Sequence, residues 1–222
     1  MKKIILGILF FTSLQSCFAQ EPQGWNFLVG TNSADFKTND FIASKGGMGV
    51  FLGVGYNAGY HETYNYQIEL AYVQNNINLK NTQLNNKKFG LGGVIQFGVY
   101  LNYYLIKPNE DKFYFGPQFG LYTSYGSTTS KEGFDNQEFF APSGLSGIDL
   151  TNTREFNYGT GFGLTGGYNR FRINMRYNLG LSNVLGAISQ VSTPGSGNDD
   201  KPYSGKISSL SLTLSYRFYN RK

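Results

Sequence analysis

Cysteine and histidine are almost missing from this chain of 222 residues, which has one of each, Cys17 and His61. A single cysteine cannot build a disulfide framework. A general base needs a nucleophile beside it, whereas His61 stands in a segment, 60–62, that we expect to be a short turn. We therefore predict no catalytic residues, no cofactor and no enzymatic activity. A lipid-modifying enzyme that depends on His61 or on a loop aspartate is the least favoured alternative.

The acidic residues of the chain do not indicate a metal site. Those in the predicted loops have a spacing that matches no calcium-binding loop, and loop acids are usually solvated. We therefore predict no bound metal. The acids considered are Asp135, Glu138, Asp149, Asp199 and Asp200.

The chain also lacks long apolar runs and clusters of positive charge. After the N-terminal segment, no stretch approaches the ~20 apolar residues of a membrane-spanning helix. Charged residues make up 15% of the chain, and its net charge of +5 is not gathered into a basic run. A nucleic-acid partner is therefore not expected.

The N-terminus has the pattern of a secretory signal. Lys2 and Lys3 precede an apolar stretch, Ile4–Phe11, and a small-x-small cleavage site ends at Ala19. We predict a signal peptide at 1–19 and one domain at 20–222. The alternative is a lipoprotein signal with an acylated Cys17, which the poor fit of Gln15 disfavours.

What the chain does contain is repeated alternation of apolar and polar residues, together with 17% aromatic residues and 29 glycines. Side chains of a strand point alternately to opposite faces, so each such stretch predicts a strand with one apolar and one polar face. Behind an export signal, eight of them favour an all-β fold, an antiparallel up-and-down transmembrane barrel of the OmpA/OmpX type, apolar towards lipid and polar towards the lumen. The predicted strands are 24–31, 47–59, 63–75, 88–104, 112–126, 155–168, 169–182 and 206–219.

The connections predict an orientation. Long connections (32–46, 76–87, 127–154 and 183–205) alternate with short ones (60–62, 105–111 and the region of Asn169 and Arg170). Outer-membrane barrels have short periplasmic turns and longer external loops. Both mature termini are therefore expected in the periplasm, with the barrel surrounded by lipid and lipopolysaccharide. Most predicted strands exceed the ~9–11 residues that cross a bilayer, so the barrel should project outwards.

Charged side chains are expected inside the lumen. The alternation places Glu69 near Arg176 at mid-height, and Arg172 and Arg217 near the periplasmic end. Eight strands enclose only enough space for side chains, which excludes a general porin. We favour a structural cluster of paired charges over a gated path for protons or small ions.

Two further groups are candidates for contacts with the surroundings. The third long connection carries an apolar set that either folds over the barrel mouth or docks a partner: Phe134, Phe139, Phe140 and Leu145. Aromatic residues near strand ends are expected as anchors at the membrane interface. They are Trp25, Tyr60, Tyr64, Tyr103, Tyr104, Tyr168, Tyr216 and Tyr219.

Several phrases of the chain are similar to one family. The segments GWNFLVGTNSADF, FYFGPQFGLYTSYG, RFRINMRYNLGLSNV and SLSLTLSYRF resemble the PorT-like outer-membrane β-barrel family, common in Bacteroidetes. The resemblance implies an eight-stranded outer-membrane barrel. It also suggests an accessory role in type IX secretion and gliding, with other outer-membrane or periplasmic proteins as partners. A narrow channel or small-ligand carrier is the alternative function.

Overall fold

The described residues of the chain form ten strands. The computed structural model describes residues 24–38, 43–61, 63–80, 86–106, 113–126, 139–140, 145–146, 154–186 and 204–218. Eight strands are long, and two short ones form a separate pair. The long strands are β1 (Gly24–Thr38), β2 (Ala43–His61), β3 (Tyr64–Lys80), β4 (Asn86–Tyr103), β5 (Tyr114–Tyr125), β8 (Phe156–Tyr168), β9 (Phe171–Gly180) and β10 (Gly205–Arg217); the short ones are β6 (Phe139–Phe140) and β7 (Leu145–Ser146).

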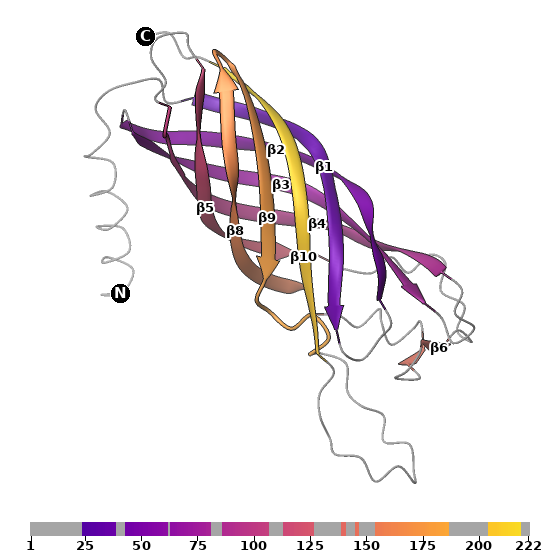
Figure 1. The fold of residues 1–222 in the computed structure, drawn as a ribbon. Helices are drawn as coiled ribbons and strands as arrows, with labels where there is room; N and C mark the ends of the chain where they lie inside the picture. Colours follow the sequence, from indigo (N-terminus) through magenta and orange to yellow (C-terminus); the bar gives the residue numbers. More distant parts are fainter. Residues whose placement is uncertain are drawn as a thin grey trace, which may run out of the picture.

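The eight long strands close into one antiparallel barrel in the order β1-β10-β9-β8-β5-β4-β3-β2 (Figure 1). Closure is made by the first and last strands, which pair from Asn26 opposite Arg217 to Thr38 opposite Gly205. Each remaining strand pairs with its neighbour in the chain, once the β6–β7 pair is set aside. The predicted eight-stranded up-and-down barrel is therefore confirmed.

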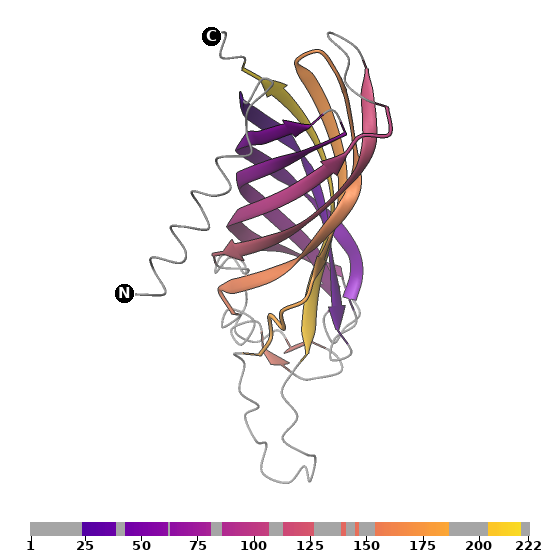
Figure 2. The same cartoon turned by 90° about the vertical axis from the view of Figure 1, so that its left-hand side faces the viewer.

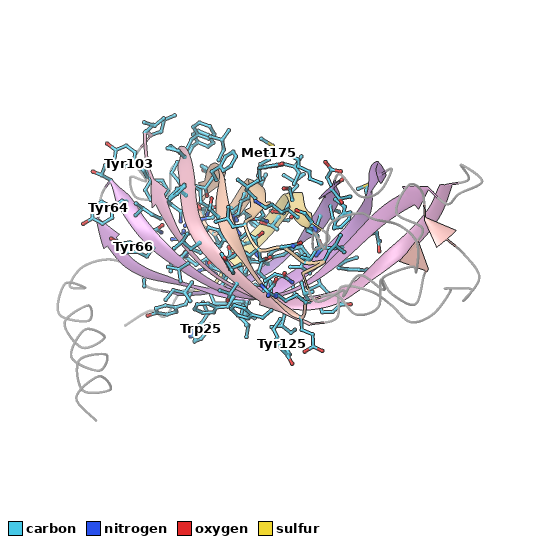
Figure 3. The ribbon with its side chains drawn as sticks, turned by 90° about the horizontal axis from the view of Figure 1, so that it is seen from below. Trp25, Tyr64, Tyr66, Tyr103, Tyr125 and Met175 are labelled. Carbon is cyan, nitrogen blue, oxygen red and sulfur yellow. The ribbon has the colours of Figure 1, made fainter. Side chains whose placement is uncertain are left out.

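The two faces of the wall have opposite polarity. Along β9, Phe171, Ile173 and Met175 are exposed, whereas Arg172 and Arg176 are buried. Trp25, Tyr64, Tyr103 and Met175 project away from the barrel (Figure 3). Apolar side chains outside and polar side chains inside is the polarity of a transmembrane barrel, the reverse of a soluble one.

The two ends of the barrel differ. We call the end at which β1 begins and β10 ends the terminal end; it is the upper end in Figures 1 and 2. The opposite end is the loop end, near which the β6–β7 pair lies (Figure 1). At the terminal end, Tyr168 pairs with Phe171 around a tight turn in which Asn169 has a φ of 55°, a left-handed conformation that asparagine tolerates.

Two of the four predicted long connections are wrong. Much of 32–46 and 76–87 is strand, because β1 has 15 residues, β2 19, β3 17 and β4 18. The strands of the other half are shorter, with 12 residues in β5, 13 in β8, 10 in β9 and 13 in β10. Only residues 39–42 and 81–85 separate the strands at those two places.

The parts of β1–β4 that lie beyond the predicted strands lack the apolar outer face from which the strands were predicted. Towards the loop end of β1, the outward side chains Thr31, Asp35 and Lys37 are exposed and polar. The apolar outer face therefore ends, and the buried inward positions carry Ala34 and Phe36, while the pairing with β10 continues to Thr38. A strand that leaves the lipid keeps its hydrogen bonds but no longer needs an apolar outer face. Among the described residues, no helix is long and apolar enough to cross a bilayer.

Candidate functional site: the polar lumen

The lumen contains the charged residues that the structure buries. In the described part of the chain these are Glu69, Arg172, Arg176 and Arg217. They form two centres. One surrounds Arg176 at mid-height, and the other surrounds Arg172 nearer the terminal end.

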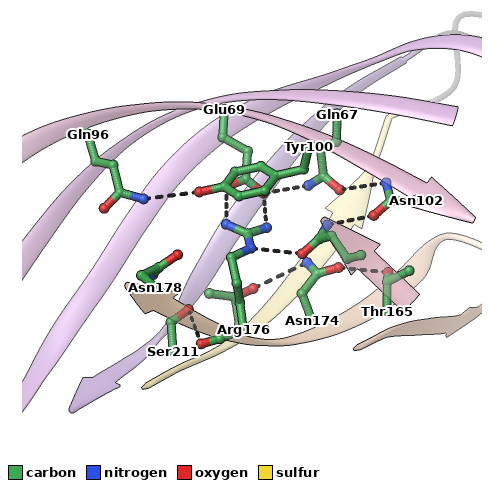
Figure 4. A network of polar contacts seen from close by, with 12 residues as sticks. Gln67, Glu69, Gln96, Tyr100, Asn102, Thr165, Asn174, Arg176, Asn178 and Ser211 are labelled. Atoms are coloured by element: carbon green, nitrogen blue, oxygen red, sulfur yellow. Dashed lines mark hydrogen bonds and ion pairs between the residues drawn. The ribbon is translucent and has the colours of Figure 1, made fainter. Parts of the chain in front are cut away.

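The centre at Arg176 spans the lumen. Its Nη1 lies 2.8 Å from Oε2 of Glu69, and its Nη2 donates to Oε1 at 3.0 Å. Glu69 is on β3 and Arg176 is on β9, which are four strands apart in either direction around the barrel. The pair therefore joins opposite walls (Figure 4). Two parallel hydrogen bonds between a guanidinium and a carboxylate are the strongest common form of this contact.

The remaining surfaces of Arg176 and Glu69 are also occupied. Nε of Arg176 donates to Oε1 of Gln118 at 2.8 Å. The Tyr100 ring stacks on the guanidinium, with 3.4 Å from Cζ to the ring centroid. Gln67 donates to Oε1 of Glu69 at 2.7 Å. Buried charges with this number of partners avoid most of the cost of leaving water.

Glycines make room for the Tyr100 ring. A Cβ atom at Gly98 or Gly120 would collide with the ring. A Cβ at Gly161 on β8 would lie 3.0 Å from the ring and 3.1 Å from Cδ of Arg176. The ring can therefore lie across the lumen between the strands because these inward positions carry no side chain.

The centre at Arg172 uses neutral acceptors. Its Nε donates to the Tyr114 hydroxyl at 3.0 Å, and its Nη2 donates to the Tyr104 hydroxyl at 3.2 Å. Its Nη1 donates to Oδ1 of Asn57 at 3.0 Å and to Oε1 of Gln67 at 2.7 Å. Gln67 therefore contacts both centres and makes them one continuous network.

Arg217 completes the terminal end. Its Nη2 donates to the Tyr114 hydroxyl at 3.5 Å, so this hydroxyl accepts from two arginines. Three buried arginines and one buried glutamate leave the described lumen with an excess of two positive charges. Tyrosine hydroxyls and amide oxygens compensate this excess through their dipoles.

Residues 181–186, which we call the lid, lie at the loop end of the lumen, where Ser182 and Val184 line a cavity. Val184 and Leu185 of the lid are buried. Oδ1 of Asn183 accepts from the backbone N–H of Leu185 at 3.1 Å and of Gly205 at 2.8 Å. Val184 N–H donates to the Gly205 carbonyl at 2.9 Å, which fastens the lid to β10.

A small cavity with a mixed polar and apolar lining lies next to the lid. Its volume is about 30 Å³, and Gln96, Ser124, Ser182 and Val184 are among its lining residues. A water molecule needs ~10–15 Å³ in this measure, so the cavity has room for about two waters. It is too small for a sugar or an amino acid.

The structure brings the predicted lumen residues together as two pairs of neighbours. Glu69 contacts Arg176, and Arg172 and Arg217 share the Tyr114 hydroxyl. Tyr100 was not predicted as a functional lumen residue, although it occupies an inward position between Gly98 and Asn102. Two-residue periodicity marks a position as inward, but it does not show which side chain reaches across to which strand.

One predicted interfacial anchor is wrong. Tyr104 is 2% exposed and points into the lumen, where its hydroxyl accepts from Arg172. It follows Tyr103, which is exposed, and successive residues of a strand point to opposite faces. Trp25, Tyr64 and Tyr168 are exposed near the terminal end, as an interfacial anchor requires.

Of the remaining candidate residues, the structure describes only some. His61 is the last residue of β2 and pairs with Tyr64. In the third long connection, Phe139 and Phe140 of β6 pair with Ser146 and Leu145 of β7. Phe134, the signal segment 1–19 and the loop acids considered for a metal lie outside the described residues. No group of three or more potential metal ligands occurs among the residues described.

A closed sheet, an apolar exterior and a filled polar lumen define the class of transmembrane β-barrels. No protein-family model and no curated protein matches the chain. Among solved structures, Neisserial surface protein A aligns over 90% of this chain and 100% of its own, with 9% identity and a TM-score of 0.45. OprG from Pseudomonas aeruginosa aligns over 91% and 99%, with 14% identity and a TM-score of 0.42. Ail of Yersinia pestis aligns over 89% and 100%, with 14% identity and a TM-score of 0.40.

Proposed function

We propose that this protein is an integral barrel of a bacterial outer membrane, a non-enzymatic structural or accessory subunit that does not conduct. The observation that carries the proposal is the Glu69–Arg176 ion pair, which joins opposite walls of the lumen. The terminal end then faces the periplasm, and the loop end faces the lipopolysaccharide and the exterior.

Three successive obstructions support the non-conducting part. The Arg172 centre occupies the terminal end, the Arg176 centre occupies the middle, and the buried side chains of Val184 and Leu185 in the lid lie at the loop end. An ion would have to separate a bidentate pair in a low-dielectric lumen to pass. That requirement disfavours the alternative, a narrow channel or small-ligand carrier.

Conductance in planar bilayers tests this part directly. We expect purified protein, inserted at the density of a porin control, to give no current steps above those of the empty bilayer. Reproducible steps from the folded protein that disappear after heat denaturation would contradict a closed lumen and favour the channel.

A charge placed on the outer face of β10 tests whether the barrel is inserted in the membrane. Leu212 is exposed on the outer face of β10, whereas its neighbour Ser211 is buried in the lumen and donates to the Arg176 carbonyl. We expect Leu212→Arg to lower the free energy of unfolding in lipid vesicles by ~2–4 kcal/mol, because it places a charge in lipid near the midplane. Leu212→Met is the matched control. Equal stability of the arginine variant and wild type would show that this face does not contact lipid.

The accessory role is supported by the resemblance to PorT-like barrels and by the long connections at the loop end. A tagged copy, extracted from native outer membranes in mild detergent, should co-purify stoichiometrically with proteins of a secretion or assembly complex. Deletion of 132–146 should remove this association if the third connection docks the partner, whereas deletion of 190–200 should not. Recovery of the barrel alone, in several detergents, would indicate a free-standing protein.

A further inference from the structure

The exterior of the barrel has a groove on one side near the terminal end. It has a volume of about 550 Å³, and its lining is almost entirely apolar. The groove runs over β5, β8, β9 and β10, from Tyr168 and Phe171 at the terminal end to Met175 and Leu212 nearer mid-height. Met175 projects away from the barrel at this side (Figure 3).

A glycine in the outward row of β8 produces the groove. Leu164, Gly166 and Tyr168 occupy successive outward positions, and Gly166 pairs with Phe115 on β5 and Ile173 on β9. All four larger side chains border the groove. The space above Gly166 therefore has apolar walls on every side and an opening towards the surroundings.

A cation lies at the terminal end of the groove. Arg170 is exposed in the turn between Tyr168 and Phe171, two of the lining residues. Its Nη1 donates to the Tyr216 hydroxyl at 3.2 Å, and the Tyr216 ring lies 5.3 Å from that of Phe171. The guanidinium is thereby held on the outer surface, next to the residues that begin the groove.

We propose that this groove is a binding site for one glycerophospholipid of the periplasmic leaflet. An acyl chain lies over Gly166, and Arg170 with the Tyr216 hydroxyl contacts the phosphate. The site combines the two chemical features of such a lipid in the right order, an anionic group at the membrane surface and an apolar chain directed to the midplane. The inference rests on the proposed insertion of the barrel in a bilayer.

Native mass spectrometry of the folded full-length barrel tests the site, with palmitoyl-oleoyl-phosphatidylglycerol as the probe. Wild type should retain one lipid at an activation energy that removes detergent. Arg170→Gln should weaken the apparent affinity about fivefold, since one cationic residue near the surface contributes ~1 kcal/mol. Palmitoyl-oleoyl-glycerol, which has no phosphate, should bind wild type and Arg170→Gln equally.

Filling the groove should abolish retention of the single lipid. Gly166→Leu does this most directly, although its Cβ would lie 3.1 Å from Cδ2 of Phe115 and the ring must shift. Leu164→Trp fills the same space from a position that already carries a side chain, so it serves where Gly166→Leu does not fold. Thr160→Leu on the same outward row and Arg154→Gln are the matched controls.

The outcomes separate this inference from the proposed function. A barrel that inserts and folds but retains no lipid, or retains it equally in the groove variants and controls, would overturn the site. Equal binding of phosphatidylglycerol by wild type and Arg170→Gln would overturn the role of Arg170. Failure of the wild type to insert into vesicles would count against the proposed membrane function instead.

Discussion

Two arginines on β9 are buried in the lumen, and different groups replace the hydration of each. Arg172 and Arg176 are four residues apart, and each is 2% exposed inside the lumen. Arg176 meets a carboxylate in a bidentate ion pair, whereas Arg172 is surrounded by the neutral oxygens of two tyrosines, an asparagine and a glutamine. A buried cation therefore does not need an acid, provided that enough oriented dipoles replace its hydration.

The two centres should also differ in how much stability is lost when their arginine is removed. Removing one member of an ion pair leaves an opposite charge buried without compensation. Removing Arg172 leaves neutral oxygens, which lose hydrogen bonds but carry no net charge. The centre with the stronger contacts should therefore be the more damaging one to break.

The largest expected effect is that of Arg176→Leu. It should lower the free energy of unfolding by ~3–5 kcal/mol, because Glu69 is left buried without its ion-pair partner. Urea titration in lipid vesicles measures this, with fluorescence of the single tryptophan, Trp25, as the signal.

Two further variants test whether the unpaired Glu69 causes this loss of stability. Glu69→Leu combined with Arg176→Leu should be less destabilising than Arg176→Leu alone, because neither member of the ion pair is left buried without its partner. Arg172→Leu should cost ~1–3 kcal/mol. A larger loss for Arg172→Leu than for Arg176→Leu would reverse the comparison.

The next largest effect is expected from Tyr114→Phe. The Tyr114 hydroxyl accepts from Arg172 at 3.0 Å and from Arg217 at 3.5 Å. Its removal should cost ~1.5–3 kcal/mol, since hydrogen bonds to charged groups are the stronger ones. Tyr168→Phe, on the exterior, is the control and should change stability by less than ~0.5 kcal/mol. Equal effects of the two would mean that the hydroxyl at Tyr114 does not stabilise the arginines.

The last variant, Gly161→Val, crowds the Arg176 centre without removing any of its polar groups, and its effect should be no larger than that of Tyr114→Phe. The new side chain must displace the Asn178 amide, the Tyr100 ring or the Arg176 stem, since a Cβ would be only 2.8 Å from Oδ1 of Asn178, 3.0 Å from the ring and 3.1 Å from Cδ of Arg176. Overfilling of this kind costs ~1–3 kcal/mol. Thr160→Val, on the outer face of the same strand, is the control. Unchanged stability of Gly161→Val, measured in the same urea titration, would show that the lumen has spare room at this level.

Part of this site was predictable from alternation alone. Once the phase of β3 and β9 is known, Glu69 and Arg176 must point inwards, and their distances from the strand ends place both near mid-height. The partners of Arg172 were not predictable in this way. Tyr104 lies at the edge of a predicted strand, where a one-residue uncertainty decides between an interfacial anchor and a lumen side chain.

The sequence by itself determined the number of barrel strands, the order of their pairing and the polarity of each face. Lipid and lumen impose a two-residue period on every strand within the membrane, and that period can be read from the residues. Only the tertiary structure decided how far β1–β4 extend beyond the lipid and which polar groups meet inside. Beyond the lipid the outer face becomes polar, and on β1 the apolar residues Ala34 and Phe36 are on the buried inner face, so the period that marks a lipid-facing strand is lost. Contacts across the lumen depend on strand register and side-chain reach, which no local pattern contains.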